Sequence, residues 1–301
     1  MSRNAYVLLL LTTLFWGGNS IAGKFAIGHV SPMVLTALRW GLAVVVLMAI
    51  GGMPRFRRDW PVVRRNLPLL FLLGATGFTL FNAAMYSALL YTSAINVSIE
   101  QAGMPMLIFV ANFVLYRMGV TLGQIAGFTL SLVGVALTAS HGNLFSLAEL
   151  DINRGDLLML GGIVIYSAYT VALRYKPAIH WQSLMLALCM AAFVISLPFV
   201  AWEWFTGRLI LPDARGWAVT AYVVVFPSVI AQIFFIRGIE LIGANRAGLF
   251  INMVPIFGTL LSIMILGEAF HLHHAVALAM VLGGIWLAEH SGRKRAMSKP
   301  D

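Results

Sequence analysis

The chain has 301 residues, of which 60% are hydrophobic and only 10% are charged, whereas an average soluble domain is about 25% charged. With a mean hydropathy of +0.89, this composition excludes an ordinary soluble protein and leaves no length for a soluble catalytic domain beside the membrane segments. The single cysteine, Cys189, excludes an intramolecular disulfide framework and a cysteine-based zinc cluster.

Apolar stretches separated by short polar breaks predict ten membrane-spanning helices, because each crossing needs about 20 apolar residues. Loops and open strands do not face lipid, so a helix is the expected state of every stretch. We therefore expect an all-α integral membrane protein. The expected helices cover residues 5–28, 32–51, 67–91, 94–116, 122–139, 156–175, 182–202, 216–237, 246–267 and 274–290.

The basic residues predict the direction of the chain through the membrane, because Lys and Arg accumulate in cytoplasmic segments. Most of the 20 basic residues fall on one side, with five arginines between residues 55 and 65, Arg246 in a later connection and Lys299 in the tail. The other side carries Lys24, Arg154, Arg208 and Arg215. Both termini are therefore expected in the cytoplasm. Because the charges are spread over many loops, the net charge of +9 does not indicate a nucleic-acid partner.

The two halves of the chain align with each other at an offset of 150 residues, which pairs Pro105 with Pro255 and Gly134 with Gly284. The offset holds from the first predicted helix to the fifth. Because each half has an odd number of helices, the second half enters the membrane from the opposite side. Such inverted repeats are typical of secondary transporters, with the substrate site near the midplane. The expected domains are two five-helix repeats, 1–150 and 151–301, the second ending in a basic cytoplasmic tail.

Two ionisable residues lie inside predicted spans, where each costs about 2.5–3.5 kcal/mol on insertion scales and indicates a functional site. Counting from the outer ends of their helices at 1.5 Å per residue places Arg39 and Glu100 both about 10 Å deep. Opposite charges at one depth relieve each other's desolvation, so we predict that they pair or share a polar cavity. The pair would either bind substrate or lock two helices together.

Further polar and aromatic side chains are expected in the same layer. Each amide alone is more often explained by a helix–helix hydrogen bond, but several helices contribute at once. The residues predicted to bind substrate are Trp16, Asn19, Arg39, Asn82, Tyr86, Glu100, Gln101, Tyr166, Tyr169, Gln232 and Asn252. This set suits a small zwitterion, with Arg39 holding its carboxylate and Glu100 its ammonium group.

No catalytic motif emerges, because neither H-E-x-x-H nor G-x-S-x-G occurs in the sequence. The outer histidines His271, His273 and His274 follow Glu268, and we interpret them as interfacial residues rather than as metal ligands. The chain is thus expected to be no enzyme and to hold no metal and no cofactor.

Two smaller features concern helix packing. Pro105 and Pro255 each remove one helix hydrogen bond and are expected to kink the fourth and ninth helices. The Gly123–Gly127 face permits close approach of another helix, either within the chain, which we prefer, or in a homodimer.

These residues together resemble the drug/metabolite transporter superfamily, in particular its EamA type. The resemblance covers nearly the whole chain. It rests on Leu-Phe-Trp-Gly-Gly-Asn at 14–19, Arg39, the segment 94–105, Gly127, Gly134-Val135, Pro255 and Leu-Gly-Glu at 266–268. It implies ten helices in two inverted halves around a central cavity.

The resemblance further implies a gradient-driven secondary transporter of the cell inner membrane that exports small metabolites by alternating access. Amino acids or related zwitterions are the expected substrates, and the lipid bilayer and this small molecule are the expected partners. Proton coupling through Glu100 is compatible with the sequence, as is a homodimer. The alternatives are a multidrug or cation exporter, a nucleotide-sugar or sugar transporter of the same superfamily, and a non-transporting receptor or channel.

Overall fold

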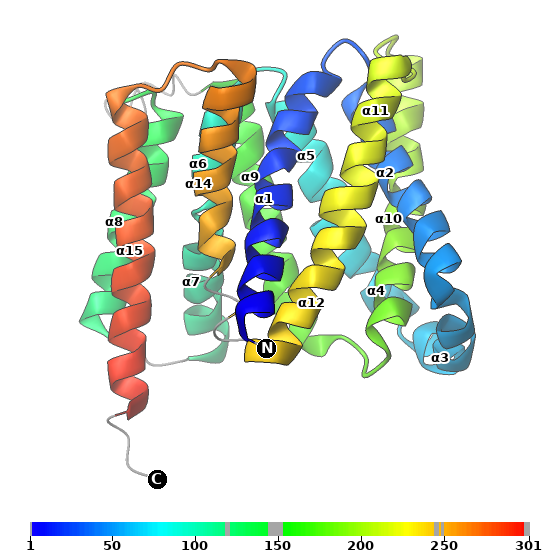
Figure 1. Cartoon of the computed structure of the whole chain (residues 1–301), viewed down its shortest axis with the longest axis horizontal. Coiled ribbons are helices and arrows are strands. Elements are labelled where there is room, and N and C mark those ends of the chain that lie inside the picture. The colour runs from blue at the N-terminus through cyan, green and yellow to red at the C-terminus, as the bar shows by residue number, and fades with distance from the viewer. Residues whose placement is uncertain (1, 118–120, 144–152, 244–246, 248–249, 298–301) are drawn as a thin grey trace.

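The computed structural model of the chain is a bundle of helices standing side by side (Figure 1). It describes residues 2–117, 121–143, 153–243, 247 and 250–297. Within this part, eight helices are long and apolar enough to cross a membrane, and two shorter apolar helices, Phe250–Leu266 and Leu272–Ala288, complete the ten predicted crossings. The predicted all-α membrane fold is confirmed.

The first half makes five crossings, of which the third and fourth are interrupted by irregular turns and the second ends in one. Its elements are α1 (Ser2–Ala26), α2 (Pro32–Leu47), the π-helical η1 (Met48–Gly52), α3 (Met53–Arg65), α4 (Leu67–Gly74), the π-helical η2 (Ala75–Leu80), α5 (Phe81–Ala88), α6 (Ala94–Gln101), α7 (Met104–Tyr116) and α8 (Leu122–Ala139).

The second half repeats this order. Its elements are α9 (Arg154–Ala172), the short η4 (Leu173–Tyr175), α10 (Trp181–Phe205), α11 (Ala214–Val223), the π-helical η5 (Val224–Ile230), α12 (Ala231–Ile242), η6 (Phe250–Met253), α14 (Val254–Leu261), the π-helical η7 (Ser262–Leu266) and α15 (Leu272–Met297).

Local irregularities recur at the offset that the sequence predicts. The π-helical turn η2 lies 150 residues before η5 to within one residue, and α8 and α15 begin at the equivalent residues Leu122 and Leu272. Isolated π-helical turns are rare and often mark functional sites, so their recurrence in the same crossing of both halves is strong evidence for the repeat. The two repeats are confirmed, and the boundary expected between residues 150 and 151 lies outside the described residues.

Both predicted proline kinks are present as helix breaks. The fourth crossing is interrupted at residues 102–103, and Pro105 lies in the first turn of α7. The ninth crossing passes from the short turn η6 into α14, with Pro255 in the first turn. Proline suits this position because its missing N–H has no partner at a helix start.

The connection after the second crossing differs from the prediction, which ended the helix at residue 51. Gly51 adopts a φ of 85°, where a glycine is needed, and the chain then continues as α3. Phe56 and Val63 are buried against the bundle, whereas the five arginines of α3 are exposed. This connection is therefore an amphipathic helix.

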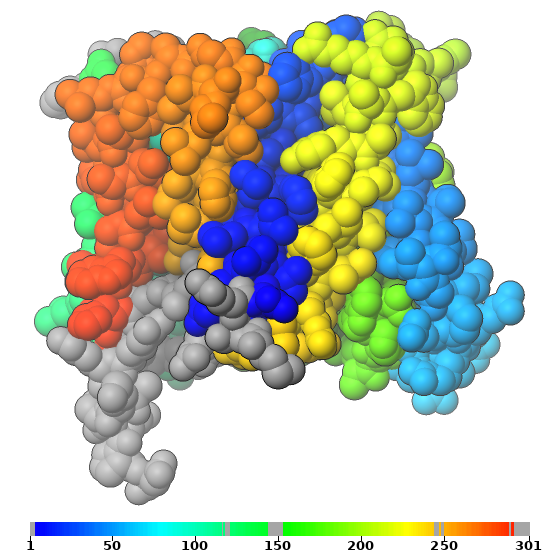
Figure 2. All heavy atoms as spheres, viewed as in Figure 1, coloured from blue at the N-terminus to red at the C-terminus, as the bar shows by residue number. Residues whose placement is uncertain are grey.

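Each half inserts its first helix into the other half. α1 packs against α11, α12 and α14 of the second half, and α9 packs against α5, α6 and α7 of the first. In Figure 1, α1 stands between α14 and α12, and in Figure 2 its upper part is recessed between α14 and α11. The two halves therefore interlock, so groups on α1 face both repeats.

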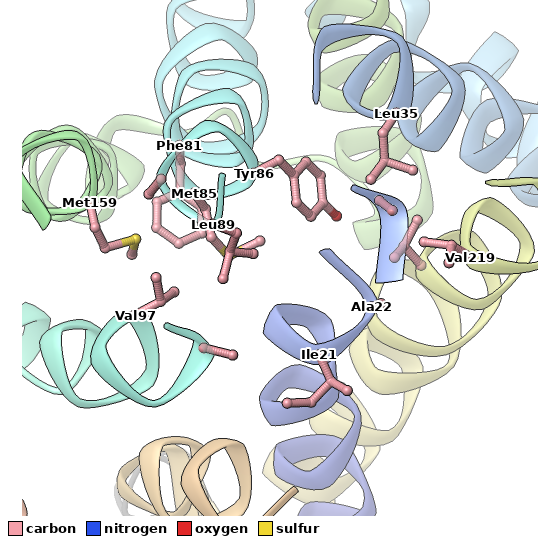
Figure 3. Packing of buried hydrophobic residues seen from close by; sticks show 14 of the residues in the cluster. Ile21, Ala22, Leu35, Phe81, Met85, Tyr86, Leu89, Val97, Met159 and Val219 are labelled. Carbon is pink, nitrogen blue, oxygen red and sulfur yellow. The ribbon is translucent and has the colours of Figure 1, made fainter. Parts of the chain in front are cut away.

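A cluster of buried apolar side chains fills the interface between the halves (Figure 3). It includes Ile21 and Ala22 of α1, Tyr86 of α5, Met159 of α9 and Val219 of α11. Such van der Waals packing is a main source of helix association in lipid. The cluster fixes α1, α5 and α11 around the polar groups described below.

At the edge of the bundle, α8 and α15 pack through glycines. A Cβ atom at Gly127 would collide with Gly284 and Ala288, and one at Gly123 with Ser291. The prediction that this face serves packing within the chain is confirmed.

α1 begins and α15 ends at the same end of the bundle, where α3 also lies (Figure 1). Arg246 and Lys299, two of the basic residues from which the direction is predicted, lie outside the described residues.

Candidate functional site

A buried arginine lies where the two halves meet. Arg39 of α2 is only 5% exposed. Its Nη1 donates to Tyr86 Oη at 2.6 Å, Asn82 Oδ1 at 2.8 Å and Asn19 Oδ1 at 3.0 Å, and its Nε donates to Ser228 Oγ at 2.8 Å. These partners come from α1, α5 and η5, so the arginine joins three crossings of the bundle to its own.

The partners of Arg39 are oriented by bonds of their own. Tyr86 Oη donates to Asn19 Oδ1 at 3.0 Å. Asn82 Nδ2 donates to the carbonyl of Phe78 at 2.7 Å, and the Ser228 hydroxyl donates to the carbonyl of Val223 at 2.7 Å. Each partner is thereby held with an oxygen facing the guanidinium. We call Arg39, Asn19, Asn82, Tyr86 and Ser228 the arginine network.

The positive charge of Arg39 is not neutralised within the arginine network. In the described part of the chain, no carboxylate lies within ion-pair distance of Arg39, and its Nη2 has no hydrogen-bond partner. The ring of Trp40 lies 4.8 Å from its Cζ, which adds a cation–π contact. An uncompensated buried charge is costly, so the site attracts an anionic group and has N–H donors left to hold it.

The aromatic residues predicted for the site surround this network. Trp16 Nε1 donates to the carbonyl of Pro227 at 3.1 Å, directly before Ser228. The ring of Tyr166 lies 5.3 Å from that of Tyr169, and Tyr166 is near enough to Arg39 to interact with its charge. The predicted residues Trp16, Asn19, Arg39, Asn82, Tyr86, Tyr166 and Tyr169 thus occupy one region.

Glu100 does not pair with Arg39 in the described part of the chain, so of the two predicted arrangements, an ion pair or a shared polar cavity, the ion pair is wrong. Glu100 is fully buried, and its charged neighbour is Asp156 of α9. The physical reason is lateral packing: α2 lies against α5, α10 and η5, whereas α6 lies against α1, α9 and α14. Equal depth therefore did not bring the two charges together.

Three further predicted residues belong to elements other than those that carry the arginine network. Gln101 donates to the carbonyl of Val97 in its own helix at 3.2 Å. Gln232 and Asn252 are half-buried on α12 and η6.

An apolar cavity of about 540 Å³ lies beside α1. Its walls come from α1, α11, α14 and η7, and Arg215 is its one charged lining residue. The recess between α14 and α11 in Figure 2 lies among the same helices. Pockets of this size hold small organic molecules, so the structure offers apolar room next to a polar site.

Tyr222 stands between the cavity and the arginine network. It lines the cavity, lies near enough to Tyr86 and Arg39 to interact with them electrostatically, and its hydroxyl is 3.5 Å from the carbonyl of Phe15. Tyr222 therefore links the wall of the cavity to the arginine network.

Three functional candidates were missed from the sequence. Ser228 and Tyr222 lie in an apolar stretch where nothing distinguishes them from ordinary helix residues. Asp156 lies in the first turn of α9, where an acidic residue is common because it interacts favourably with the helix dipole.

The outer histidines and Glu268 have structural partners. Glu268 accepts hydrogen bonds from the backbone N–H groups of Ala94 and Ile95 at 2.9 and 3.0 Å, and so caps α6. His274 Nε2 lies 3.1 Å from Asn96 Oδ1. Among the described residues, no group of three or more His, Cys, Asp or Glu side chains could hold a metal ion.

Two interlocked inverted repeats of five membrane helices, with a polar site between them, define a multi-pass membrane transporter. The sequence model of the EamA-like transporter family matches residues 3–140 and 153–289. The chain belongs to this family, as the resemblance predicted, and its members are transporters rather than enzymes.

Similar proteins extend over nearly the whole chain. The uncharacterized transporter YyaM of Bacillus subtilis is 26% identical over 95% of this chain and 93% of its own length. The uncharacterized inner membrane transporter YicL of Salmonella typhimurium is 24% identical over 98% of both chains. A solved crystal structure with 22% identity covers 97% of this chain and 99% of its own with a TM-score of 0.66, which shows that the fold is shared.

Proposed function

We propose that the chain is a secondary active transporter that exports a small amphipathic carboxylate, with amino acids and related zwitterions as the substrate class. The observation that carries this proposal is Arg39: among the described residues, this buried guanidinium has neutral partners only, and its Nη2 makes no hydrogen bond. A carboxylate at this position forms charge-assisted hydrogen bonds, which are about twice as strong as neutral ones.

The apolar cavity supports the proposal that the substrate carries an apolar side chain. Leu261, Ile265 and Val219 are among its lining residues, so it suits an apolar side chain rather than a sugar, whose hydroxyls would be left without partners. The fixed positive charge of Arg39 likewise disfavours a cationic drug. The carboxylate is expected at Arg39 and the side chain towards the cavity.

The interlocked halves support alternating access. In inverted-repeat carriers, one repeat rocks against the other around a fixed site, and the arginine network is held by both repeats through Ser228. We place both termini in the cytoplasm, because α1 begins and α15 ends on the side of the exposed arginines of α3 (Figure 1). The inner membrane is the location given for the relative YicL, and we propose the same for this chain.

The test is counterflow in proteoliposomes with radiolabelled L-leucine, D-glucose and tetraphenylphosphonium. Leucine is expected to exchange, and Arg39→Gln is expected to abolish the exchange. Arg39→Lys keeps the charge but lacks the planar fork, so it should retain only part of the rate. Arg237→Gln is the matched control, because Arg237 is 61% exposed and pairs with Glu240 on the surface.

Two results would contradict the proposal. Exchange of tetraphenylphosphonium or glucose without leucine would assign another substrate class. Ohmic conductance without saturable exchange would indicate a channel.

A further inference from the structure

A second polar site lies apart from the arginine network, at the contact of α6 and α9. Glu100 and Asp156 are both fully buried there, and their carboxyl groups lie next to each other. Neither oxygen of Glu100 has a hydrogen-bond partner within the described residues. A buried acceptor without a donor is costly, so Glu100 needs a group that donates to it.

A proton is the group that fits. Two ionised carboxylates are both acceptors and repel each other, whereas one proton between them makes one carboxyl a donor to the other. No amide, hydroxyl or ammonium donor in the described part of the chain reaches Glu100.

Asp156 connects this pair to an exposed histidine. Nε2 of His141 lies 3.3 Å from its Oδ2, and the His141 side chain is 52% exposed. On the other side, Asn96 Nδ2 lies 3.5 Å from Asp156 Oδ1, and Asn96 Oδ1 faces His274 Nε2. An imidazole that reaches water and touches a buried carboxylate is suited to pass protons.

The remaining titratable and charged groups around the pair come from the elements packed on α6 and α9. Glu268 accepts hydrogen bonds from the backbone at the start of α6. Lys24 Nζ donates to the carbonyl of Leu89 at 2.8 Å. Tyr86 on α5 faces Arg39, and Arg154 on α9 is exposed. Of the histidines, His141 contacts Asp156 directly, and the outer histidines His271, His273 and His274 interact with one another and with His141. Three of the elements that pack against α6, namely α8, α14 and η7, contain no ionisable side chain.

The pair is placed where it can influence the transport site. Glu100 lies in the last turn of α6, and its carbonyl accepts from the N–H of Gly103 at the helix break. Two residues earlier, Ser98 Oγ lies 3.2 Å from Ser20 Oγ of α1, and Ser20 follows Asn19 of the arginine network. A shift of α6 against α9 is thereby transmitted to α1.

We propose that Glu100 and Asp156 form a proton-binding pair, filled from the face where His141 is exposed, which couples substrate transport to the proton gradient. The proton comes from water through the His141 imidazole and joins the two carboxyls. When it leaves, the two negative charges repel, and α6 moves away from α9. This coupling rests on the proposed transport function, whereas the proton site itself does not.

Proton binding is measured without any substrate, by infrared titration of the purified full-length protein. The wild type is expected to show the carbonyl band of a protonated carboxyl at neutral pH, which disappears at alkaline pH. Glu100→Gln should abolish this band, and Asp156→Asn should shift its frequency because the hydrogen-bond partner changes. Glu203→Gln is the matched control, since Glu203 is also buried but accepts from Ser31 Oγ at 2.5 Å and from the N–H of Met33 at 3.1 Å.

Size-exclusion profiles establish that each variant is folded. A band that persists in folded Glu100→Gln overturns the proposal. So does a band that responds to sodium chloride but not to choline chloride, because the pair would then be a sodium site. After a pH jump, His141→Gln should slow the loss of the band relative to His290→Gln, and equal rates would overturn the route through His141.

Coupling is tested in proteoliposomes with radiolabelled L-leucine and an imposed pH gradient. Glu100→Gln is expected to lose gradient-driven accumulation while counterflow persists, and gradient-driven accumulation by this variant overturns the coupling. If the wild type exchanges no leucine at all, the proposed function fails, whereas the infrared result still decides the proton site.

Discussion

Arg39 Nε donates to Ser228 Oγ over 2.8 Å, and this bond joins the first repeat to the second inside the membrane. Ser228 lies in the π-helical turn η5, and its hydroxyl also donates to the carbonyl of Val223 five residues earlier. The hydroxyl can make both bonds because it has one hydrogen to donate and two lone pairs to accept.

Ser228→Ala tests this bond. Hydrogen bonds to charged groups contribute about 1.5–3 kcal/mol, so the variant should unfold at a lower temperature and show a raised KM for counterflow of leucine. Ser196→Ala is the control, because Ser196 is equally buried but bonds only within its own helix, to the carbonyl of Phe193. Equal effects of both substitutions on KM would show that Ser228 does not position Arg39.

Glu268 caps α6 from the far end of the chain. It accepts from the first two N–H groups of α6, and losing a helix cap costs about 0.5–2 kcal/mol. Glu268→Ala should therefore lower the unfolding temperature in detergent, whereas Glu240→Ala, at an exposed surface ion pair, should have little effect. An unchanged unfolding temperature in Glu268→Ala would mean that α6 does not depend on this cap.

The sequence predicts those features of the protein that depend only on position along the chain. Ten crossings follow from the length of apolar runs, and the repeat follows from a constant offset. The depth of Asn19, Asn82 and Tyr86 along their helices was enough to place them with Arg39.

The neighbour of Glu100 was not predictable in this way. Depth fixes the position of a residue along its helix, but its partner depends on which helices pack together and on how each is rotated. Asp156 became the partner because α6 lies against α9, a contact between the repeats that no local pattern encodes. The α3 helix was missed for a related reason, since its few apolar residues face the bundle only once the fold exists.

The contact of His29 with Asp213 predicts an acid-sensitive connection between the repeats. The hydrogen bond from His29 Nδ1 to Asp213 Oδ2, 2.6 Å long, is the main cause that lowers the pKa of this carboxyl below its ordinary value. A carboxyl whose pKa is lowered in the folded state stabilises it above the unfolded pKa, and this contribution is lost as the pH falls through the folded pKa. Thermal unfolding should show this loss only at pH values below about 4, and Asp213→Asn should remove it. If the two proteins respond identically to acid, the contact is not stabilising.

The contact of α8 with α15 is tested by adding one methyl group. A Cβ atom at Gly127 would lie 2.8 Å from the backbone nitrogen of Ala288 and collide with the carbonyl of Gly284, whereas one at Gly161 of α9 would meet nothing within 4 Å. Overpacking costs about 1–3 kcal/mol, which exceeds the gain of about 1 kcal/mol from replacing glycine by alanine in a helix. Gly127→Ala should therefore unfold at a lower temperature than the wild type, and Gly161→Ala at an equal or higher one. A stabilised Gly127→Ala would mean that the two helices can separate without loss, and that their close approach is not what holds the last crossing to the bundle.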